Sequence, residues 1–342
     1  MRYARTYPEL VDIRDIDRSD EDQLRQFWLV GKAAEDAYRP YDFYTPYESA
    51  RVAYADGGRP GFRNRMLGAY DGDRMVGRAY LNFPTLDNTH LCFLDLHVHP
   101  DAQRRGIGRS LVEVAVEGAR AEGRRTVVAE TYVPSGADGP ALAFARATGF
   151  TEAIEEGIKI VDLVETEVTW PMLAQEAAAR SEGYTLVAWD DAVPEELVEE
   201  FCRLNEAFND EAPSGELELE PEVWDEKRVR DGEAQNRKIG RHVFAVAAIA
   251  PDGTMAGLTE AVIGAHAPTR GFQSGTLVLP EHRGHALGLA MKIANHQAIR
   301  KAFPECRILM TGNAGVNAAM NAVNERLGYR EVERCVEVQR DV

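Results

Sequence analysis

The chain has 342 residues, of which 44% are hydrophobic and 28% charged, a composition that excludes a disordered, collagen-like or membrane-spanning protein. Its length predicts about two globular domains. The formal net charge of −17 argues against nucleic acid or an anionic membrane as partner and favours neutral or cationic molecules.

The cysteines and the first residues indicate the compartment. Four cysteines lie far apart without a CxxC pair, so we expect free thiols and no metal site. The first ten residues lack the apolar core of a secretory signal, and the longest apolar run, 243–250, is too short to cross a bilayer. We therefore expect a cytoplasmic protein.

Hydrophobic periodicity predicts alternating helices and strands in the first half of the chain. In chain order, the expected elements are a strand near 11–14, helices within 20–55, a hairpin over 65–83, a strand over 91–99, a helix over 107–122, a strand over 125–133, a helix over 140–148 and final strands. The same order is expected again in the second half.

An internal repeat at an offset of about 180 residues supports this duplication. Residues 98–108 align without a gap on 278–288, and in both places a strand-like run precedes the segment and a helical run follows it. Further landmarks recur in the same order: the hairpin turns at 71–72 and 252–253, the strands at 126–131 and 306–311, and the Gly-aromatic pairs at 149–150 and 328–329. We predict an N-terminal domain over 1–165, a linker over 166–182 and a C-terminal domain over 183–342.

The repeated segment has the chemistry of an anion-binding turn. A strand that enters a helix through such a turn brings several backbone N–H groups to one point. Gly106 and Gly108 permit close approach of the backbone, and Arg104, Arg105 and Arg109 can form charge-assisted contacts to phosphate oxygens. The spacing is neither the dinucleotide fingerprint GxGxxG nor a P-loop.

The run 103–108, Gln-Arg-Arg-Gly-Ile-Gly, resembles the Q/R-x-x-G-x-G/A acetyl-CoA signature of the GNAT superfamily of N-acetyltransferases. The order of elements around it is similar to that family over nearly all of each copy, so the chain resembles the tandem GNAT proteins, a group that includes mycothiol synthase. The resemblance implies an α/β fold of the α+β type. Two tandem domains are expected, each a mixed, mostly antiparallel sheet flanked by helices, with the two strands around the signature helix splaying apart to hold the pantetheine arm.

The resemblance also implies acetyl-CoA, and hence coenzyme A, as the cofactor. Its expected contacts in the first copy are Val98, Gln103, Arg104, Arg105, Gly106, Ile107, Gly108 and Arg109. Those in the second copy are Val278, Arg283, Gly284, His285, Ala286, Leu287, Gly288, Asn313 and Asn317. The backbone at Val98 and Val278 could also bind the developing oxyanion. Because Ala286 replaces the first glycine of the signature, we expect the first turn to bind phosphate better.

Three residues are candidate catalytic bases. Asp95 and His97 alternate with apolar residues and share one face of a strand, where they could relay a proton; a hydrogen-bonded or solvent-facing strand surface is the alternative. Glu260 lies in an otherwise apolar strand of the second hairpin. It is either a catalytic base or an ordinary strand-edge glutamate. The tyrosine that many family members place four residues before the Gly-aromatic pair is replaced by Ala145 and Asn324.

The function that follows is an acetyl-CoA-dependent N-acetyltransferase acting on the primary amine of a small molecule by direct attack on the thioester. The alternative is a non-catalytic acyl-CoA sensor or partner-binding protein with degenerate domains. Residues 190–233 contain seventeen acidic and four basic residues, which form either a solvated surface or a border of the acceptor groove that attracts a cationic amine. No nucleic acid or membrane partner is expected.

Overall fold

The computed structural model describes residues 11–39, 41, 43–211 and 213–342. The first ten residues, predicted to lack a secretory signal, lie outside the described part. Contacts divide the chain into two compact units: unit 1 contains the residues up to Thr131 together with Pro140–Glu152 and Glu337–Val342, and unit 2 contains Tyr132–Gly139 and Ala153–Val336. Among the described residues, none of the helices combines the length and apolar composition that crossing a membrane requires.

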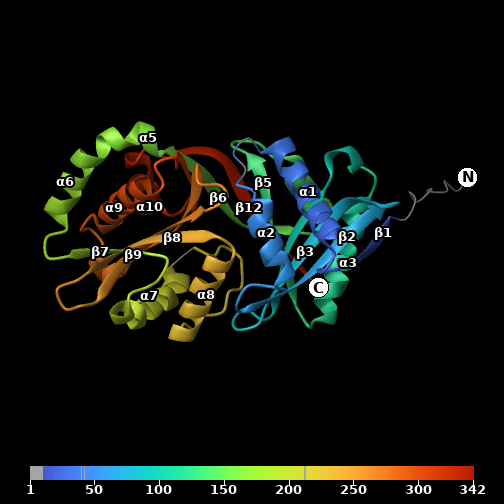
Figure 1. Ribbon diagram of the computed structural model, residues 1–342, viewed down its shortest axis with the longest axis horizontal. Coiled ribbons are helices and arrows are strands. Elements are labelled where there is room, and N and C mark those ends of the chain that lie inside the picture. Colours follow the sequence, from blue (N-terminus) through green and yellow to red (C-terminus); the bar gives the residue numbers. More distant parts are fainter. Residues whose placement is uncertain (1–10, 40, 42, 212) are drawn as a thin grey trace, which may run out of the picture. The chain divides into compact units, whose positions relative to one another are not determined.

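Unit 1 is a mixed sheet with helices on both faces (Figure 1). Its elements are β1 (Asp12–Asp15), α1 (Glu21–Tyr38), α2 (Tyr47–Ala55), β2 (Phe62–Asp71), β3 (Arg74–Pro84), β4 (Leu91–Val98), α3 (Ile107–Ala121), the start of β5 (Thr126–Pro134) and α4 (Pro140–Ala147). The strand order is β1-β2-β3-β4-β5, antiparallel except for the parallel pair β4–β5. The predicted hairpin, signature helix and following strand are all present.

Unit 2 repeats this plan. Its elements are most of β6 (Thr151–Asp162), α5 (Leu163–Thr166), α6 (Trp170–Arg180), β7 (Thr185–Asp190), α7 (Val198–Glu211), α8 (Glu226–Lys238), β8 (Arg241–Ile249), β9 (Met255–Gly264), β10 (Arg270–Val278), α9 (Leu287–Ala302), β11 (Ile308–Ala314), α10 (Ala318–Arg326) and the start of β12 (Arg330–Asp341). The strand order is β6-β11-β10-β9-β8-β7, and only β10–β11 is parallel.

Two apolar clusters fix the helices of unit 2 to opposite faces of its sheet. On one face, α7 and α8 bury Phe201, Leu204 and Val229 against Ala245 and Leu258. On the other, α6 and α9 pack on Phe244, Ala261 and Ile263. Figure 1 shows α7 and α8 on one side of β8 and β9, and α9 and α10 on the other. The sheet of unit 2 therefore separates two helical layers.

The segment predicted as a linker is packed into unit 2. Residues 166–182 contain the end of α5 and all of α6, which begins at Trp170 next to Pro171. Trp170, Leu173 and Ala177 are buried in the same cluster as α9. The units follow contacts rather than chain order, so their bounds differ from 1–165 and 183–342. The sequence boundary between the repeats stays a prediction.

The ends of the two repeats illustrate this difference. β6 follows the first repeat in sequence, yet Glu156–Asp162 pairs antiparallel with β11 of unit 2. The last residues of the chain belong to unit 1, where Arg340 donates to the carbonyl of Thr148 at 2.8 Å and the Val342 amide donates to the carbonyl of Arg125 at 2.9 Å. Each unit is thus completed by a segment from the other repeat.

Candidate functional site

The two glycine-bearing turns adopt the same unusual backbone conformation. In the first turn Arg104 and Gly106 have φ values of 64° and 87°, and in the second Gly284 and Ala286 have 88° and 56°. These pairs occupy aligned positions of the repeat. Left-handed residues that alternate with ordinary ones point successive N–H groups to one side and form an anion-binding concavity. The duplication predicted from the sequence therefore extends to backbone geometry.

The backbone donors of both turns are available to a ligand. The amides of residues 104–109 and 284–289 donate to no acceptor among the described residues, and neither α3 nor α9 has a side-chain N-cap bond. Helix N-termini with free N–H groups favour negatively charged ligands. The geometry fits a phosphate group in either turn.

Side chains hold the first turn in place. The Gln103 side chain donates from Nε2 to the Val98 carbonyl at 3.2 Å, which ties the turn to the end of β4. Arg105 forms an exposed ion pair with Asp71 at 2.9 Å, and Arg109 donates to a backbone carbonyl of α4. Arg104 is exposed and has no hydrogen-bond or ion-pair partner in the described part of the chain. Arg104 is therefore the guanidinium most readily available to phosphate.

The second turn has an equivalent tie and a different surface. The Arg283 side chain donates from Nε to the Val278 carbonyl at 3.2 Å, the same length as the bond from Gln103. Tyr184 hydrogen-bonds to the ring of His282 at 3.0 Å and packs against His285, with their ring centroids 5.3 Å apart. Cationic side chains are fewer here than around the first turn, which we expect to be the stronger phosphate site.

Replacing Ala286 with glycine is expected to raise the free energy of unfolding by about 1 kcal/mol. A residue with a Cβ is strained in the left-handed conformation, whereas glycine is not, and this gain outweighs the loss of one partly buried methyl group. Gly106→Ala, at the aligned position, is expected to lower stability by a similar amount. Urea unfolding of both variants checks the pair, and a less stable Ala286→Gly protein would contradict the strain argument.

The parallel strands behind each turn separate from one another. The β4–β5 register ends at Leu94 and Ala129, and the β10–β11 register ends at Phe272 and Met310, within the described residues. In unit 2 the β9–β10 pairing also carries a bulge between Gln273 and Thr276. The divergence that the resemblance implied is present in both copies.

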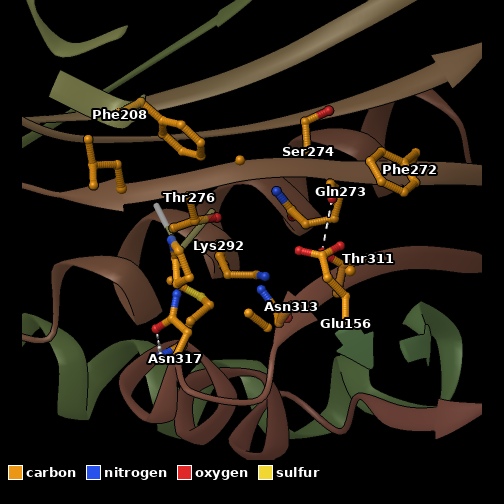
Figure 2. A pocket seen from close by; sticks show the side chains of 16 residues that line it. Glu156, Phe208, Phe272, Gln273, Ser274, Thr276, Lys292, Thr311, Asn313 and Asn317 are labelled. Atoms are coloured by element: carbon orange, nitrogen blue, oxygen red, sulfur yellow. Dashed lines mark hydrogen bonds between the residues drawn. The ribbon is translucent and has the colours of Figure 1, made fainter. Parts of the chain in front are cut away.

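In the second copy, a cavity of about 320 Å³ lies between the separating strands β10 and β11 (Figure 2). Its walls are the separating parts of β10 and β11, with α9 and α10 at one end and two residues of the 190–233 segment at the rim. The lining residues include Phe208, Gln273, Lys292, Asn313 and Asn317. Asn313 and Asn317, both predicted as cofactor contacts, are thus brought together with β10. The sequence favoured the first copy, whereas this cavity lies in the second.

Two cavity-lining residues were missed by sequence reasoning. Gln273 is 1% exposed and donates from Nε2 to the Glu260 carbonyl at 2.5 Å, while its buried Oε1 has no hydrogen-bond partner. A buried acceptor without a donor indicates a ligand N–H at this point. Lys292 is 1% exposed. Its signal was a single lysine in the otherwise apolar run 287–293.

Glu260 lies on β9, next to the strand that lines the cavity. It pairs with Ala245 of β8, and Ala245 and Leu258 both pack against α7 and α8, so the Glu260 side chain shares that face of the sheet. Burial raises the pKa of its carboxyl to about 7. A carboxylate with a pKa near neutrality is suited to accept a proton from an amine.

The predicted pair in the first copy lies in a closed ionic network. The His97 ring contacts Asp95 through Nδ1 and Glu35 of α1 through Nε2, both at 2.9 Å. Burial lowers the pKa of His97, but the charge of Asp95 and the hydrogen bonds to both carboxylates outweigh burial and raise it. Both ring nitrogens are engaged, so His97 could act as a base only after one contact opened.

Arg78 completes this network from β3. Its side chain is 2% exposed, hydrogen-bonds to Asp95 and to the Tyr54 hydroxyl, and stacks over Phe27 at 4.6 Å. Burial raises the pKa of Asp95, but the charges of Arg78 and His97 outweigh it and hold that pKa below its usual range. Asp95 is therefore a counter-ion rather than a proton acceptor at neutral pH.

The residue aligned with Glu260 in the first copy is Tyr80. Its hydroxyl accepts a hydrogen bond from Asn64 at 2.6 Å, and its ring packs edge-on against Phe27 and Tyr54. Burial raises the pKa of this phenol to about 12, so it remains protonated at neutral pH. The two copies thus differ in chemistry at the same point of the fold.

Comparison with known proteins agrees with this architecture. Residues 26–150 match the family model described as the acetyltransferase (GNAT) family. No curated protein has a significantly similar sequence. Among solved structures, the chain is similar to a tandem GNAT protein from the clavulanic acid biosynthesis pathway, solved without acetyl-CoA, with 26% identity and a TM-score of 0.79 over 97% of this chain and 98% of that one.

Two further structures share the fold at lower identity. A GCN5-related N-acetyltransferase from Sphaerobacter thermophilus is 17% identical, with a TM-score of 0.66 over 98% of this chain and 97% of that one. The N-myristoyltransferase of Saccharomyces cerevisiae with bound myristoyl-CoA is 10% identical, with a TM-score of 0.60 over 97% of this chain and 78% of that one. At these identities the likeness shows the fold.

The mixed, mostly antiparallel sheets, the paired turns and the diverging strands give the chain the same fold as these structures. Residues 26–150 thus carry a domain that matches the GNAT family, and the whole chain is similar to a solved tandem GNAT protein.

Proposed function

We propose that the chain is an acetyl-CoA-dependent N-acetyltransferase that acetylates the primary amine of a small molecule, with turnover in the second copy. The observation that carries the proposal is the cavity between β10 and β11. β10 leads into the free-amide turn, and β9, which pairs with β10, carries Glu260, whose pKa is raised. The first copy supplies the same turn but a closed ionic network.

The residues of the second copy fit acetyl-CoA. The free amides of residues 284–289 suit a pyrophosphate, Asn313 and Asn317 can hydrogen-bond to amide groups of the pantetheine arm, and the orphaned Oε1 of Gln273 can accept an N–H. When bound, acetyl-CoA supplies an acetyl thioester. Backbone N–H groups near Val278, at the end of β10, would stabilise negative charge on the carbonyl oxygen.

Glu260 is the proposed general base. A protonated amine cannot attack a carbonyl carbon, so a group must take its proton near neutral pH. The raised pKa of Glu260 suits that step, and the carboxylate faces the side of the sheet covered by α7 and α8. The attacking amine would enter from that side. The amine nitrogen then forms the new C–N bond as the C–S bond breaks.

The acidic segment favours a cationic acceptor. Residues 190–233, which contain α7 and the first part of α8, cover the face on which Glu260 lies, and Phe208 and Pro213 of this segment line the cavity. Excess negative charge around a cleft concentrates cations near it. A small molecule with more than one amino group would match this surface.

A thiol-release assay with a library of amines tests the proposal. Wild-type protein is expected to release coenzyme A thiol from acetyl-CoA in the presence of cationic primary amines, with acetylated product found by mass spectrometry. Binding of acetyl-CoA without thiol release from any amine would favour the acyl-CoA sensor instead.

Removing the first-turn arginines is expected to weaken acetyl-CoA binding in the first copy by about tenfold. Two exposed charge-assisted contacts to phosphate account for about that difference. Isothermal titration of the Arg104→Ala, Arg105→Ala double variant against wild type measures it. Arg63→Ala is the control, because that exposed arginine pairs with Glu122 at the other end of α3. Equal affinity of the double variant and wild type would contradict phosphate binding at this turn.

A further inference from the structure

We propose that Lys292 donates the proton to the departing thiolate in the second cleft, from the face of the sheet opposite Glu260. This inference rests on the proposed function and adds a general acid to it. The base and the acid would then stand on two sides of the gap between β10 and β11.

Lys292 is a buried amine that faces the cavity. Figure 2 shows its side chain extending from α9 into the space between β10 and β11, close to Asn313. Its Nζ donates to Asn324 Oδ1 at 2.7 Å and lies 4.8 Å from the ring centroid of Tyr329. It forms no ion pair with any described residue. A buried ammonium without a counter-ion is costly, so a structural role alone is a poor account of it.

The residues around Lys292 cannot supply the proton themselves. Asn324 stands four residues before the Gly-Tyr pair 328–329, and its amide donates to Asn313 Oδ1 at the cavity wall. Neither amide is an acid. Among the described residues that line the cavity, the ionisable side chains are Lys292 and Glu156. An ionised Glu156 would repel a thiolate, whereas an ammonium attracts it.

Lys292 and the titratable groups that face it differ in pKa, and Lys292 is the group among them that changes charge near neutral pH. Burial, and then the charge of Lys159 on β6, lower the pKa of Lys292 to about 7. Burial and then Lys292 lower the pKa of His296, one turn along α9, to about 3, so that ring is neutral. Burial raises the pKa of Tyr329, which stays a neutral phenol. A general acid works best when its pKa lies near the operating pH.

The proposed step balances without a further reactant. Glu260 first takes the proton of the ammonium form of the amine and passes it to solvent. As the C–N bond forms, Glu260 takes the second proton that the nitrogen loses, and the electron pair of the breaking C–S bond goes to sulfur. That sulfur takes a proton from Lys292 Nζ, which becomes a neutral amine. Proton exchange with solvent then returns Glu260 to the carboxylate and Lys292 to the ammonium.

The test compares wild type with Lys292→Met and Lys159→Met. Methionine removes the charge of Lys292 at similar length, and thermal unfolding shows whether the variant remains folded. In wild type, kcat for acetyl transfer is expected to fall above about pH 7. Lys292→Met is expected to lower kcat by about 10²-fold and to remove this basic limb. Lys159→Met is expected to keep the limb and move it to higher pH, because it removes a neighbouring positive charge.

A second readout does not depend on turnover. In protein labelled with ¹³C-lysine, the side-chain signal of Lys292, assigned by its absence from Lys292→Met, is followed by NMR. The signal is expected to titrate near pH 7 without ligand. It is expected to shift on addition of coenzyme A and to shift less with desulfo-coenzyme A, which lacks the thiol.

Three results would overturn the role of Lys292 while leaving the proposed function intact: a basic limb retained by Lys292→Met, equal shifts with coenzyme A and desulfo-coenzyme A, or acetylation of Lys292 itself in the intact mass. Failure of wild type to bind coenzyme A would instead overturn the proposed function, and the role of Lys292 with it.

Discussion

Replacement of Glu260 by Gln is expected to lower kcat/KM for acetyl transfer by about 10²- to 10⁴-fold, the usual effect of removing a general base. Gln keeps the size of the side chain but cannot accept the amine proton. Because the pKa of Glu260 is raised to about 7, the wild-type rate is expected to fall as the pH drops below that value, when the carboxyl becomes protonated. The variant is expected to lose this acidic limb.

To check this prediction, rates are measured from about pH 5 to about pH 9, roughly two units on either side of the expected pKa. Asp190→Asn is the matched control. Its carboxyl also has a raised pKa, because of burial and the neighbouring Asp191, but it lies at the end of β7, the edge strand of unit 2. Its variant is expected to keep the wild-type profile. An acidic limb that survives in Glu260→Gln would exclude Glu260 as the base.

Replacement of Arg78 by Met is expected to destabilise unit 1 by about 3 kcal/mol, the lower end of the range for removing one partner of a buried ion pair, because the Arg78 side chain is 2% exposed but that of Asp95 is 43% exposed. The variant leaves Asp95 without its main counter-charge and removes the stacking over Phe27. Its effect should be smallest at about pH 6, where protonated His97 still provides a positive charge next to Asp95, and should grow as His97 loses its proton. Because the pKa of His97 is raised in the folded protein, protonation of His97 stabilises the fold. This stabilisation is fully present below the ordinary pKa of 6.5 and is lost as the pH rises through the folded-state pKa.

Urea unfolding at about pH 6 and at about pH 9 measures the change and its dependence on pH. Arg105→Met provides the comparison, because Arg105 and Asp71 form an ion pair whose side chains are 46% and 50% exposed. Exposed pairs contribute about 1 kcal/mol or less, so this variant should unfold close to wild type. Similar stability of the two variants would show that the Arg78 network contributes little.

The sequence was sufficient for features that depend on local pattern. The order of strands and helices, the duplicated turn and its entry into a helix are encoded by periodicity and by glycines within a few residues of one another. The left-handed conformation of Ala286 could be predicted only from its alignment with Gly106, because an alanine by itself does not indicate a positive φ. The grouping of Asn313 and Asn317 with the second turn was likewise expected from the family resemblance, and both line the cavity.

Long-range contacts could not be predicted in the same way. Asp95 and His97 were correctly placed on one strand face, but their partners come from α1 and β3. These contacts decide whether His97 is free to accept a proton or is held in an ionic network. The cavity depends on where two parallel strands stop pairing, and the burial of Lys292 depends on how α9 packs under that gap. Neither is a property of a short stretch of residues.

The assignment of Glu337–Val342 to unit 1 has a consequence for biosynthesis. A ribosome makes the first repeat long before the segment that completes unit 1, so the edge strand of that unit stays unpaired until residues 337–342 have been made. Contacts of such large sequence separation form slowly. Truncating the chain between the repeats should therefore yield an aggregation-prone fragment rather than a working half enzyme, and a circular permutant that rejoins the final strand to the first repeat would be the better route to an isolated domain.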